Sequence, residues 1–314
     1  MTVELAPVKA FAELERWAAL RNAAFPRRPE SAADLAADLD AYERRIHLLA
    51  LLDGRDAGAG FALLEPGQPP RVADALVAVA PELAGRGVGS ALLAALSRWA
   101  AGEGFSELQG HAAEDDRGAL AWAARRGFAE VLRESLLVLD LRELEPPDPA
   151  PPPGVAVLTL AERPELVRGI YEVACEAYPD VPGNDDYEVE PFEDWVAHDL
   201  GGAGDRPEAT FAAVAGDEVV GFSKFHLSEA RPETATHDVT GVRRAWRGRG
   251  IAGALKRAQV AWALDAGFER LETMNEVRNA PIRKLNERLG YRLAPGRVLL
   301  RGPLWHSPGN ALQS

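Results

Sequence analysis

The chain contains an internal repeat, and this repeat constrains its fold more than any other feature. A shift of 163 residues superimposes 84–128 on 247–291 without a gap, and 13 of the 45 positions are identical. The glycine-rich stretches Gly85-Arg-Gly87 and Gly248-Arg-Gly250 fall on each other in this alignment. Because the identities keep register with the glycines, the sequence predicts two copies of one fold.

A proline-rich segment separates the copies. Positions 145–154 read EPPDPAPPPG, with six prolines between 146 and 153. Proline lacks a backbone N–H and favours an extended chain, so this segment is typical of a linker. We therefore expect an N-terminal domain over 1–145, a linker over 146–153 and a C-terminal domain over 154–314.

Each copy shows the same order of periodic segments. Helices are expected first, then three strands, a glycine loop, an amphipathic helix, a short strand, another helix and a closing strand. The first copy places its helices at 9–22 and 31–45 and its strands at 46–52, 58–64, 73–79, 107–111 and 132–139. The second copy places its helices at 162–178 and 190–200 and its strands at 210–215, 218–227, 235–242, 270–274 and 297–300. This alternation predicts α/β domains with covered sheets.

Composition excludes several classes of protein. Hydrophobic residues make up 47% of the chain and the net charge is −13, which argues for a globular protein and against a nucleic-acid partner. No apolar run approaches the roughly 20 residues of a membrane-spanning helix. The single cysteine, Cys175, excludes an intramolecular disulfide and a thiolate metal site, and we expect it in the core. We expect a cytoplasmic protein with no metal and no membrane partner.

The segment 242–252 lies between a predicted strand and a predicted helix, where glycines let the backbone approach a ligand closely. The N-terminus of the following helix presents free N–H groups, so the segment suits a pyrophosphate. Nearby arginines add positive charge, namely Arg243, Arg244, Arg247 and Arg249.

Other interpretations of this loop are weaker. Gly248-x-Gly250-x-x-Gly253 matches the dinucleotide-binding fingerprint, but five residues separate it from its strand and the first copy has Ser90 at the third glycine. A phosphate loop of the Gly-Lys-Ser/Thr type is absent. A simple structural turn explains one copy better than it explains two.

The motif Val242-x-x-x-x-Arg247-Gly-x-Gly250-x-Ala252, then a helix, Gly267-Phe268, Asn279 and Leu289-Gly290-Tyr291, resembles the GNAT superfamily of acyl-CoA-dependent N-acyltransferases. The first copy resembles it less, because Ala84 occupies the Arg/Gln position of the loop. The resemblance implies two tandem GNAT-like domains, each a mixed, mostly antiparallel sheet with helices on both faces. It also implies that the N-terminal loop has diverged and that the C-terminal domain is catalytic.

The resemblance implies acetyl-CoA as the acyl-donor substrate. The residues expected to hold it are Val242, Arg247, Gly248, Arg249, Gly250, Ile251 and Ala252. Asn279 either bonds the pantetheine arm or caps its helix. The corresponding residues of the first copy are Arg86, Gly87 and Gly89.

In this family the acceptor amine attacks the thioester directly, in a ternary complex. The expected base is His237 or Asp238, only one of which can face the cleft because strand neighbours point to opposite faces; Glu233 is a more distant candidate. The family often places an acidic tyrosine four residues before the motif glycine, where this chain has Asn286, and Ala123 in the first copy. Asn286 can hydrogen-bond the CoA sulfur or the acceptor, and Tyr291 is expected in the core.

Nine acidic residues and no Lys or Arg lie between 176 and 199: Glu176, Asp180, Asp185, Asp186, Glu188, Glu190, Glu193, Asp194 and Asp199. By resemblance this segment borders the acceptor site, where acidic groups concentrate cationic amines. A solvated acidic loop is the alternative.

We therefore predict an N-acetyltransferase that moves an acetyl group from acetyl-CoA to a primary amine of a small cationic acceptor, as a monomer or a homodimer. The alternative is a non-catalytic acyl-CoA-binding sensor or scaffold.

Overall fold

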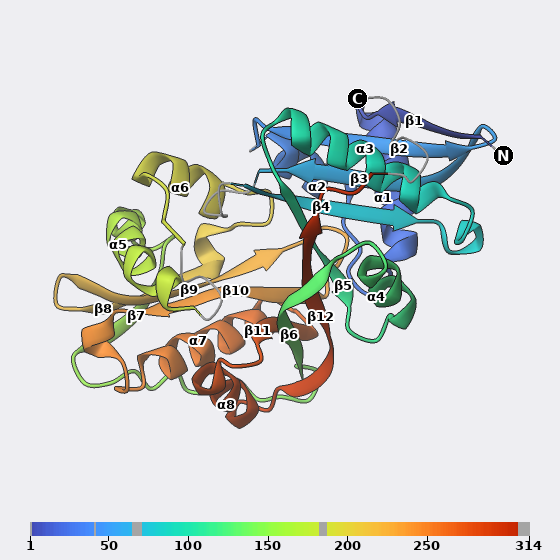
Figure 1. Cartoon of the computed structure of the whole chain (residues 1–314). Helices are drawn as coiled ribbons and strands as arrows, with labels where there is room; N and C mark the ends of the chain where they lie inside the picture. The colour runs from blue at the N-terminus through green and yellow to red at the C-terminus, as the bar shows by residue number, and fades with distance from the viewer. Residues whose placement is uncertain (1, 41, 65–70, 182–186, 307–314) are drawn as a thin grey trace. The chain divides into compact units, whose positions relative to one another are not determined.

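The computed structural model describes residues 2–40, 42–64, 71–181 and 187–306. The chain divides into two compact units. Unit 1 comprises residues 1–133 together with 297–314, and unit 2 comprises residues 134–296. Figure 1 labels the helices and strands of both units.

Unit 1 has the strand order β1-β2-β3-β4-β5-β12. Its strands are β1 (Val3–Pro7), β2 (Arg45–Leu52), β3 (Arg55–Leu63), β4 (Val72–Val79), β5 (Glu107–Ala113) and the end of β12 (Arg292–Pro303). Its helices are α1 (Phe11–Ala24), α2 (Ala32–Asp40), α3 (Val88–Gly102) and α4 (Arg117–Ala124). Only β4 and β5 pair in parallel; the other described pairs within the unit are antiparallel.

Unit 2 repeats this plan with the strand order β6-β11-β10-β9-β8-β7. Its strands are β7 (Val155–Thr159), β8 (Thr210–Ala215), β9 (Glu218–Leu227), β10 (Thr234–Val242), β11 (Arg270–Glu276) and the end of β6 (Ala129–Asp140). Its helices are α5 (Val167–Ala177), α6 (Phe192–Asp199), α7 (Ile251–Asp265) and α8 (Ala280–Arg288). The expected α/β fold, with a mixed and mostly antiparallel sheet, is confirmed.

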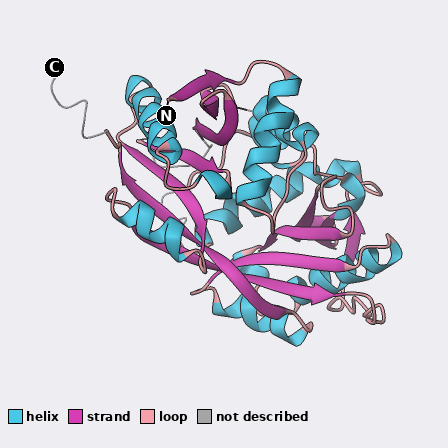
Figure 2. Cartoon of the chain, turned by 90° about the vertical axis from the view of Figure 1, so that its right-hand side faces the viewer, coloured by secondary structure: helices cyan, strands magenta, loops and turns pink. Residues whose placement is uncertain are grey.

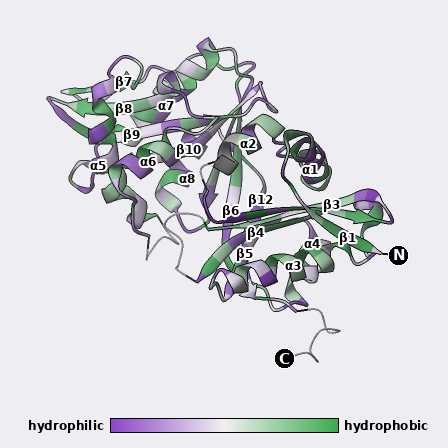
Figure 3. Cartoon of the chain, turned by 90° about the horizontal axis from the view of Figure 1, so that it is seen from above, coloured by the Kyte–Doolittle hydropathy of each residue, from purple (hydrophilic) through white to green (hydrophobic). Residues whose placement is uncertain are grey.

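Helices cover both faces of each sheet (Figures 1 and 2). In unit 2, α5 and α6 bury one core cluster around Ile170, Trp195 and Phe222, whereas α7 buries Ile251 and Leu255 against Val220 on the other face. The helices of unit 1 carry polar and apolar colours side by side, as amphipathic helices with one packed face do (Figure 3).

The closing strand of each repeat copy completes the other unit. Residues 134–140 of β6, from the first copy, pair antiparallel with 270–276 of β11. Residues 297–303 of β12, from the second copy, pair antiparallel with 107–113 of β5. Leu137 and Leu139 are buried in the unit 2 core beside Tyr291. The compact units therefore divide at 133/134 and 296/297, and not at the linker, because each closing strand pairs outside its own copy.

Most of the expected elements are present, and β8 and β9 have the predicted ends. The sequence did not predict the outer strands β1 and β7, which are five residues long and too short for a clear period. The segment expected as helix to residue 45 ends at Asp40, and Pro164 begins a short 3-10 turn before α5.

The linker, 146–153, contains neither helix nor strand. Arg257 on α7 donates hydrogen bonds to the carbonyl oxygens of Asp148, Pro149 and Ala150 at 2.8–3.3 Å. The linker is thereby attached to the surface of unit 2.

Cys175 is exposed on α5, so the expectation of a core cysteine is wrong. Its neighbours Val173 and Ala174 face the core instead, because only one stripe of α5 packs on the sheet. Among the described residues, no helix is long and apolar enough to cross a membrane.

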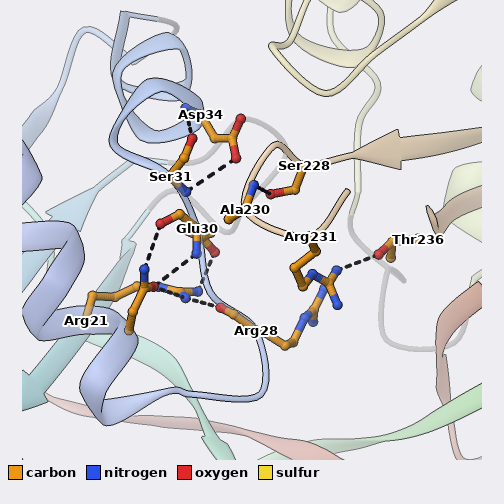
Figure 4. A network of polar contacts seen from close by, with 10 residues as sticks. Arg21, Arg28, Glu30, Ser31, Asp34, Ser228, Ala230, Arg231 and Thr236 are labelled. Atoms are coloured by element: carbon orange, nitrogen blue, oxygen red, sulfur yellow. Dashed lines mark hydrogen bonds and ion pairs between the residues drawn. The ribbon is translucent and has the colours of Figure 1, made fainter. Parts of the chain in front are cut away.

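Polar networks fix loops in each unit (Figure 4). In unit 1, buried Arg21 donates to Glu30 and to the carbonyl oxygen of Arg28, and Ser31 exchanges hydrogen bonds with Asp34 at the start of α2. In unit 2, Arg231 donates to Thr236 Oγ1 at 2.8 Å and to Glu272 at 2.7 Å, so it bridges two paired residues of β10 and β11.

Cleaving the linker should leave the two halves together. We expect a protease site that replaces Pro151–Pro153 to be cut without dissociation, because each fragment supplies a strand to the other unit. Size-exclusion chromatography of the cleaved protein would show one species that contains both fragments. Two separately eluting, folded fragments would contradict the strand exchange.

Candidate functional site

The strands β10 and β11 separate part-way along their length. Their parallel pairing covers 234–237 with 270–273 and then stops, although β10 continues to Val242 and β11 to Glu276. Beyond His237 and Thr273, one edge of each strand faces a gap. Backbone N–H and C=O groups on such an edge need partners, which a bound ligand can supply.

A β-bulge in β10 lies at the start of this gap. His237 pairs with Phe225 and Thr240 with Ser223, so β10 holds one more residue than β9 between these pairs. Asp238 bonds Lys224, and Val239 packs in the core cluster of α5 and α6, so both bulge residues lie on that face. Bulges re-aim side chains and are frequent beside active sites.

Unit 1 lacks this extra residue. There Asp74 pairs with Gln109, and the 163-residue shift maps Gln109 onto Glu272. In unit 2, Glu272 pairs with Thr236, which lies 162 residues after Asp74. The shift is thus one residue shorter at this pair than at the glycine loops, where it is 163. The insertion in β10 therefore lies between this pair and the loop, and unit 1 has the single Leu76 where unit 2 has Asp238 and Val239.

The two glycine loops share one backbone conformation. Gly248 and Gly250 have φ of +75° and +86°, and Gly85 and Gly87 have +79° and +89°. Gly250 and Gly87 are the N-cap residues of α7 and α3. Because L side chains are strained at such angles, the conformation requires glycine. The unit 1 loop, which the sequence predicts to have diverged, therefore keeps the backbone conformation of the unit 2 loop, and only its side chains differ.

The arginines of the unit 2 loop are engaged by acidic side chains. Arg244 and Arg247 both pair with Asp180 at 2.7 Å, and they hold the pKa of that carboxyl at about 2. Arg243 pairs with Glu172, and Arg249 stacks on Trp246. These side chains fasten the loop to unit 2, so its anion-binding capacity comes chiefly from the backbone N–H groups at the start of α7.

His237 and Asp238 lie in different environments. His237 is 3% exposed; its Nδ1 lies 3.1 Å from Gln259 Oε1, and its Nε2 contacts the hydroxyl of Tyr291. Burial, with a smaller effect of Lys256, lowers the pKa of His237 well below its usual value. Asp238 keeps 46% of its side-chain surface exposed although many protein atoms surround it. Asp238 is therefore the accessible member of the pair, and Tyr291 lies in the core as expected.

Lys224 organises the acidic groups around Asp238. This buried ammonium contacts Asp205 at 2.8 Å, Asp238 at 2.9 Å and the carbonyl oxygen of Asp199. Burial lowers the pKa of Lys224, but the three carboxylates outweigh burial and raise it. Burial likewise raises the pKa of Asp238, and Lys224 more than offsets this, so that carboxyl is ionised at neutral pH.

Asp199, at the end of α6, is a site residue that the sequence placed only within the acidic stretch. Its Oδ1 accepts a hydrogen bond of 2.9 Å from the buried Tyr178 hydroxyl. Burial raises the pKa of Asp199 to about 6 against the opposing effect of Lys224. No sequence pattern marks Asp199, because its neighbours come from β9, β10 and the 3-10 turn at Tyr178.

The rest of the acidic stretch divides into separate groups. Glu176 accepts from the backbone N–H of Arg244, and Glu190 contacts His198. Three further carboxylates are exposed to solvent, namely Glu188, Glu193 and Asp194. Asp185 and Asp186 lie outside the described residues.

Two asparagines border the gap on the side of β11. Asn286 is fully buried; its Nδ2 donates to Asn275 Oδ1 at 2.7 Å, and its own Oδ1 has no partner among the described residues. Asn279 occupies the N-cap position of α8, followed by a first-turn proline, but its side chain makes no capping hydrogen bond. The Oδ1 of Asn286 can therefore accept a further hydrogen bond.

Aromatic side chains lie beside the unit 1 loop. A Cβ on Gly89 would lie 3.4 Å from Trp122 and 3.4 Å from Val79. The Arg126 guanidinium lies 4.0 Å from the centroid of the Trp122 ring and donates to Ser90 at 2.7 Å. These side chains narrow the space between α3 and the end of β4.

Comparison with known proteins identifies the family. The sequence model of the acetyltransferase (GNAT) family matches residues 13–128 and 167–291, one match in each repeat copy. The chain belongs to the GNAT acetyltransferase family.

Relatives of this acetyltransferase cover most of its length. A mycothiol acetyltransferase of Nocardia farcinica is 31% identical over 267 residues, 80% of each chain. A second mycothiol acetyltransferase, from Pseudarthrobacter chlorophenolicus, is 26% identical over 74% of this chain and 71% of its own.

Two solved structures share the tandem fold. A tandem GNAT protein from the clavulanic acid biosynthesis pathway has a TM-score of 0.78 at 21% identity, covering 98% of this chain and 100% of its own. A GCN5-related N-acetyltransferase from Sphaerobacter thermophilus has a TM-score of 0.75 at 22% identity, covering 96% of both chains.

Enzymes of this family use acyl-CoA, and the residues of unit 2 suit such a substrate. The loop from Arg247 to Ala252 presents backbone N–H groups without Cβ atoms at its two turns. The free edge of β10 offers further backbone groups, and the unpartnered Oδ1 of Asn286 adds a buried acceptor at the gap.

Replacing Asp199 by asparagine should change how stability depends on pH. The folded-state pKa of about 6 lies above the ordinary value of 3.8, so the unfolded chain loses this proton first and stability falls as pH rises between these values. The melting temperature of Asp199→Asn, minus that of the wild type, should rise from pH 4 to pH 6 and then level off.

The exposed Asp194, also on α6, provides a matched control. Asp194→Asn should show a nearly constant difference in melting temperature over the same range. A flat difference for Asp199→Asn as well would contradict the raised pKa.

Proposed function

We propose that this acetyltransferase moves an acetyl group from acetyl-CoA to a primary amine of a small cationic acceptor, and that unit 2 carries the reaction. The observation that carries the proposal is the position of Asp238. Its carboxylate is accessible, ionised and held by Lys224 on the bulge where β10 leaves β11. We expect it to act in the cytoplasm, on an acceptor that is neither a nucleic acid nor a membrane component.

The charges around Asp238 favour a cationic acceptor. Lys224 supplies one positive charge to the three carboxylates Asp199, Asp205 and Asp238. The group keeps a net negative charge even when Asp199 is protonated. An alkylammonium ion that approaches this group is therefore attracted before it reacts.

Asp238 would act as the base. It accepts a proton from the ammonium of the acceptor, and the resulting amine attacks the thioester carbonyl carbon. A C–N bond forms, the C–S bond breaks, and the electron pair leaves on sulfur. Backbone N–H groups along the free edge of β10, up to Val242, would stabilise the negative charge on the carbonyl oxygen.

Unit 1 lacks the features that support catalysis in unit 2. It has Leu76 in place of the bulge with its carboxylate, and Trp122 lies against the first turn of α3. Its loop keeps the backbone conformation for an anion, with Arg86, Gly87 and Gly89 at the corresponding positions. We therefore assign the acyl transfer to unit 2.

The names of the curated relatives support a small-molecule acceptor. Both are mycothiol acetyltransferases, and they share 31% and 26% identity with this chain. The tyrosine that often serves as acid in the family is replaced by Asn286, so the same acceptor does not follow from this similarity.

Binding of acetyl-CoA tests the assignment of the unit. We expect isothermal titration to give one equivalent for the wild type. Gly250→Trp should abolish binding, because a side chain at φ +86° strains the loop and occupies the start of α7. Gly87→Trp makes the matched change in unit 1, and this variant should still bind one equivalent of acetyl-CoA.

Two equivalents in the wild type would mean that the unit 1 loop also binds. No binding at all would contradict the acyltransferase proposal. Binding without release of CoA across a broad panel of amines would favour the alternative, a non-catalytic sensor or scaffold.

Removing the base tests the role of Asp238. With polyamines and amino sugars as acceptors and CoA thiol release as the assay, Asp238→Asn should lower kcat by about 10²–10⁴. The affinity for acetyl-CoA should not change. Asp205→Asn is the matched control, because Asp205 contacts the same lysine but is 5% exposed. An equal loss in both variants would indicate a structural role for Asp238.

A further inference from the structure

The proposed reaction leaves a thiolate, and Asn286 cannot give it a proton. An amide side chain donates hydrogen bonds but has no acidic proton near neutral pH. If unit 2 has the proposed function, another titratable group near the β10–β11 gap must supply this proton.

Lys256 on α7 is such a group. It is 1% exposed, and no carboxylate contributes to the shift of its pKa. Buried lysines nearly always have a counter-ion, as Lys224 does. The chain also has only four lysines among its 35 basic residues, so 31 are arginine. Unlike arginine, lysine can lose its proton in a buried site.

The position of Lys256 along α7 brings it level with the gap. The helix runs antiparallel to β10: Ala263 packs in one core cluster with Ala235, and Ile251 packs in another with Val242. Gln259 contacts His237, the last residue of β10 that pairs with β11. Lys256 lies three residues nearer the loop, about 4.5 Å along the helix axis. It is therefore level with the stretch of β10 that has no partner in β11.

Residues near α8 place Lys256 on the same side as Asn286. The Lys256 ammonium lies 5.9 Å from the centroid of the Tyr291 ring. The backbone N–H of Tyr291 bonds the carbonyl oxygen of Asn286 at 3.1 Å. Asn286 in turn bonds Asn275, two residues beyond the last paired residue of β11. Lys256 and Asn286 thus border one gap from two helices.

The surroundings of Lys256 favour an ammonium group that gives up its proton near neutral pH. His237 from β10 and Tyr291 before β12 lie near Lys256, Gln259 lies three residues along α7, and no carboxylate contributes to the shift of the Lys256 pKa. Burial alone lowers the pKa of Lys256 to about 7. Gln259 Nε2 has no partner among the residues that the structure describes, so the cluster keeps hydrogen-bonding capacity for a ligand.

We propose that Lys256 is the acid of this acyltransferase, whose ammonium group donates a proton to the departing CoA thiolate. The proton passes from Nζ to sulfur as the C–S bond breaks, which leaves a neutral amine and a free CoA thiol. The amine regains a proton from solvent after product release. The acceptor nitrogen loses two protons, one to Asp238 before the attack and one to solvent as the amide forms. Asp238 returns its proton to solvent and Lys256 takes one back, so the overall reaction releases one proton.

The ionisation of bound CoA tests this role without an acceptor. The ultraviolet absorbance of the thiolate is followed against pH in the complex of CoA with the wild type, Lys256→Met and Lys256→Gln. Both variants remove the charge, methionine with an apolar chain and glutamine with a polar one, and circular dichroism checks that they fold. Lys284→Met is the matched control, because Lys284 is exposed on α8.

We expect the acid dissociation constant of the bound thiol to be at least about tenfold smaller in both Lys256 variants than in the wild type and in Lys284→Met. Equal constants in all four proteins, each with bound CoA, would overturn the role of Lys256 and leave the proposed function intact. Failure of the wild type to bind CoA would overturn the proposed function itself.

Discussion

The separation of β10 from β11 is possible because each strand keeps a second partner. All seven residues of β11 pair with β6, and β10 pairs with β9 as far as Val242. The two strands can therefore part after His237 without leaving the chain unsupported, and only the backbone groups that face the gap lose their partners. The β6 strand comes from the other repeat copy, so the edge of the candidate site depends on the exchange of closing strands.

Burial has opposite outcomes for the pKa of two lysines in unit 2, Lys224 and Lys256. Lys224 is surrounded by carboxylates, which keep it charged and hold Asp238 in place. No carboxylate offsets the burial of Lys256, and burial favours its neutral form. The first is a fixed positive charge, whereas the second can exchange a proton near neutral pH. Lys224 lies on β9 beside Asp205 and Asp238, whereas Lys256 lies on α7 beside the Tyr291 ring.

The two repeat copies retained the backbone features and diverged in the side chains. Both loops place glycines at positive φ before a helix, because the turn itself requires them. A single inserted residue in β10 gives the two copies different side chains at this point. In unit 2 it directs Asp238 toward Lys224, whereas unit 1 has Leu76 there. One insertion in a strand thus changes which side chains border the gap.

The sequence by itself determined the repeat, the order of strands and helices, the glycine loops and the family, since these follow from local periodicity and from motifs within one segment. It also narrowed the base to His237 or Asp238. Tertiary structure showed that Asp238 is the accessible one of the two, because the faces of β10 depend on a bulge that only strand pairing reveals. It likewise decided the exchange of β6 and β12, the pairing of the loop arginines with acidic residues and the exposure of Cys175. Lys256 gave no signal in the sequence, because its surroundings come from a helix, a strand and a turn up to 35 residues away and exist only once these elements pack.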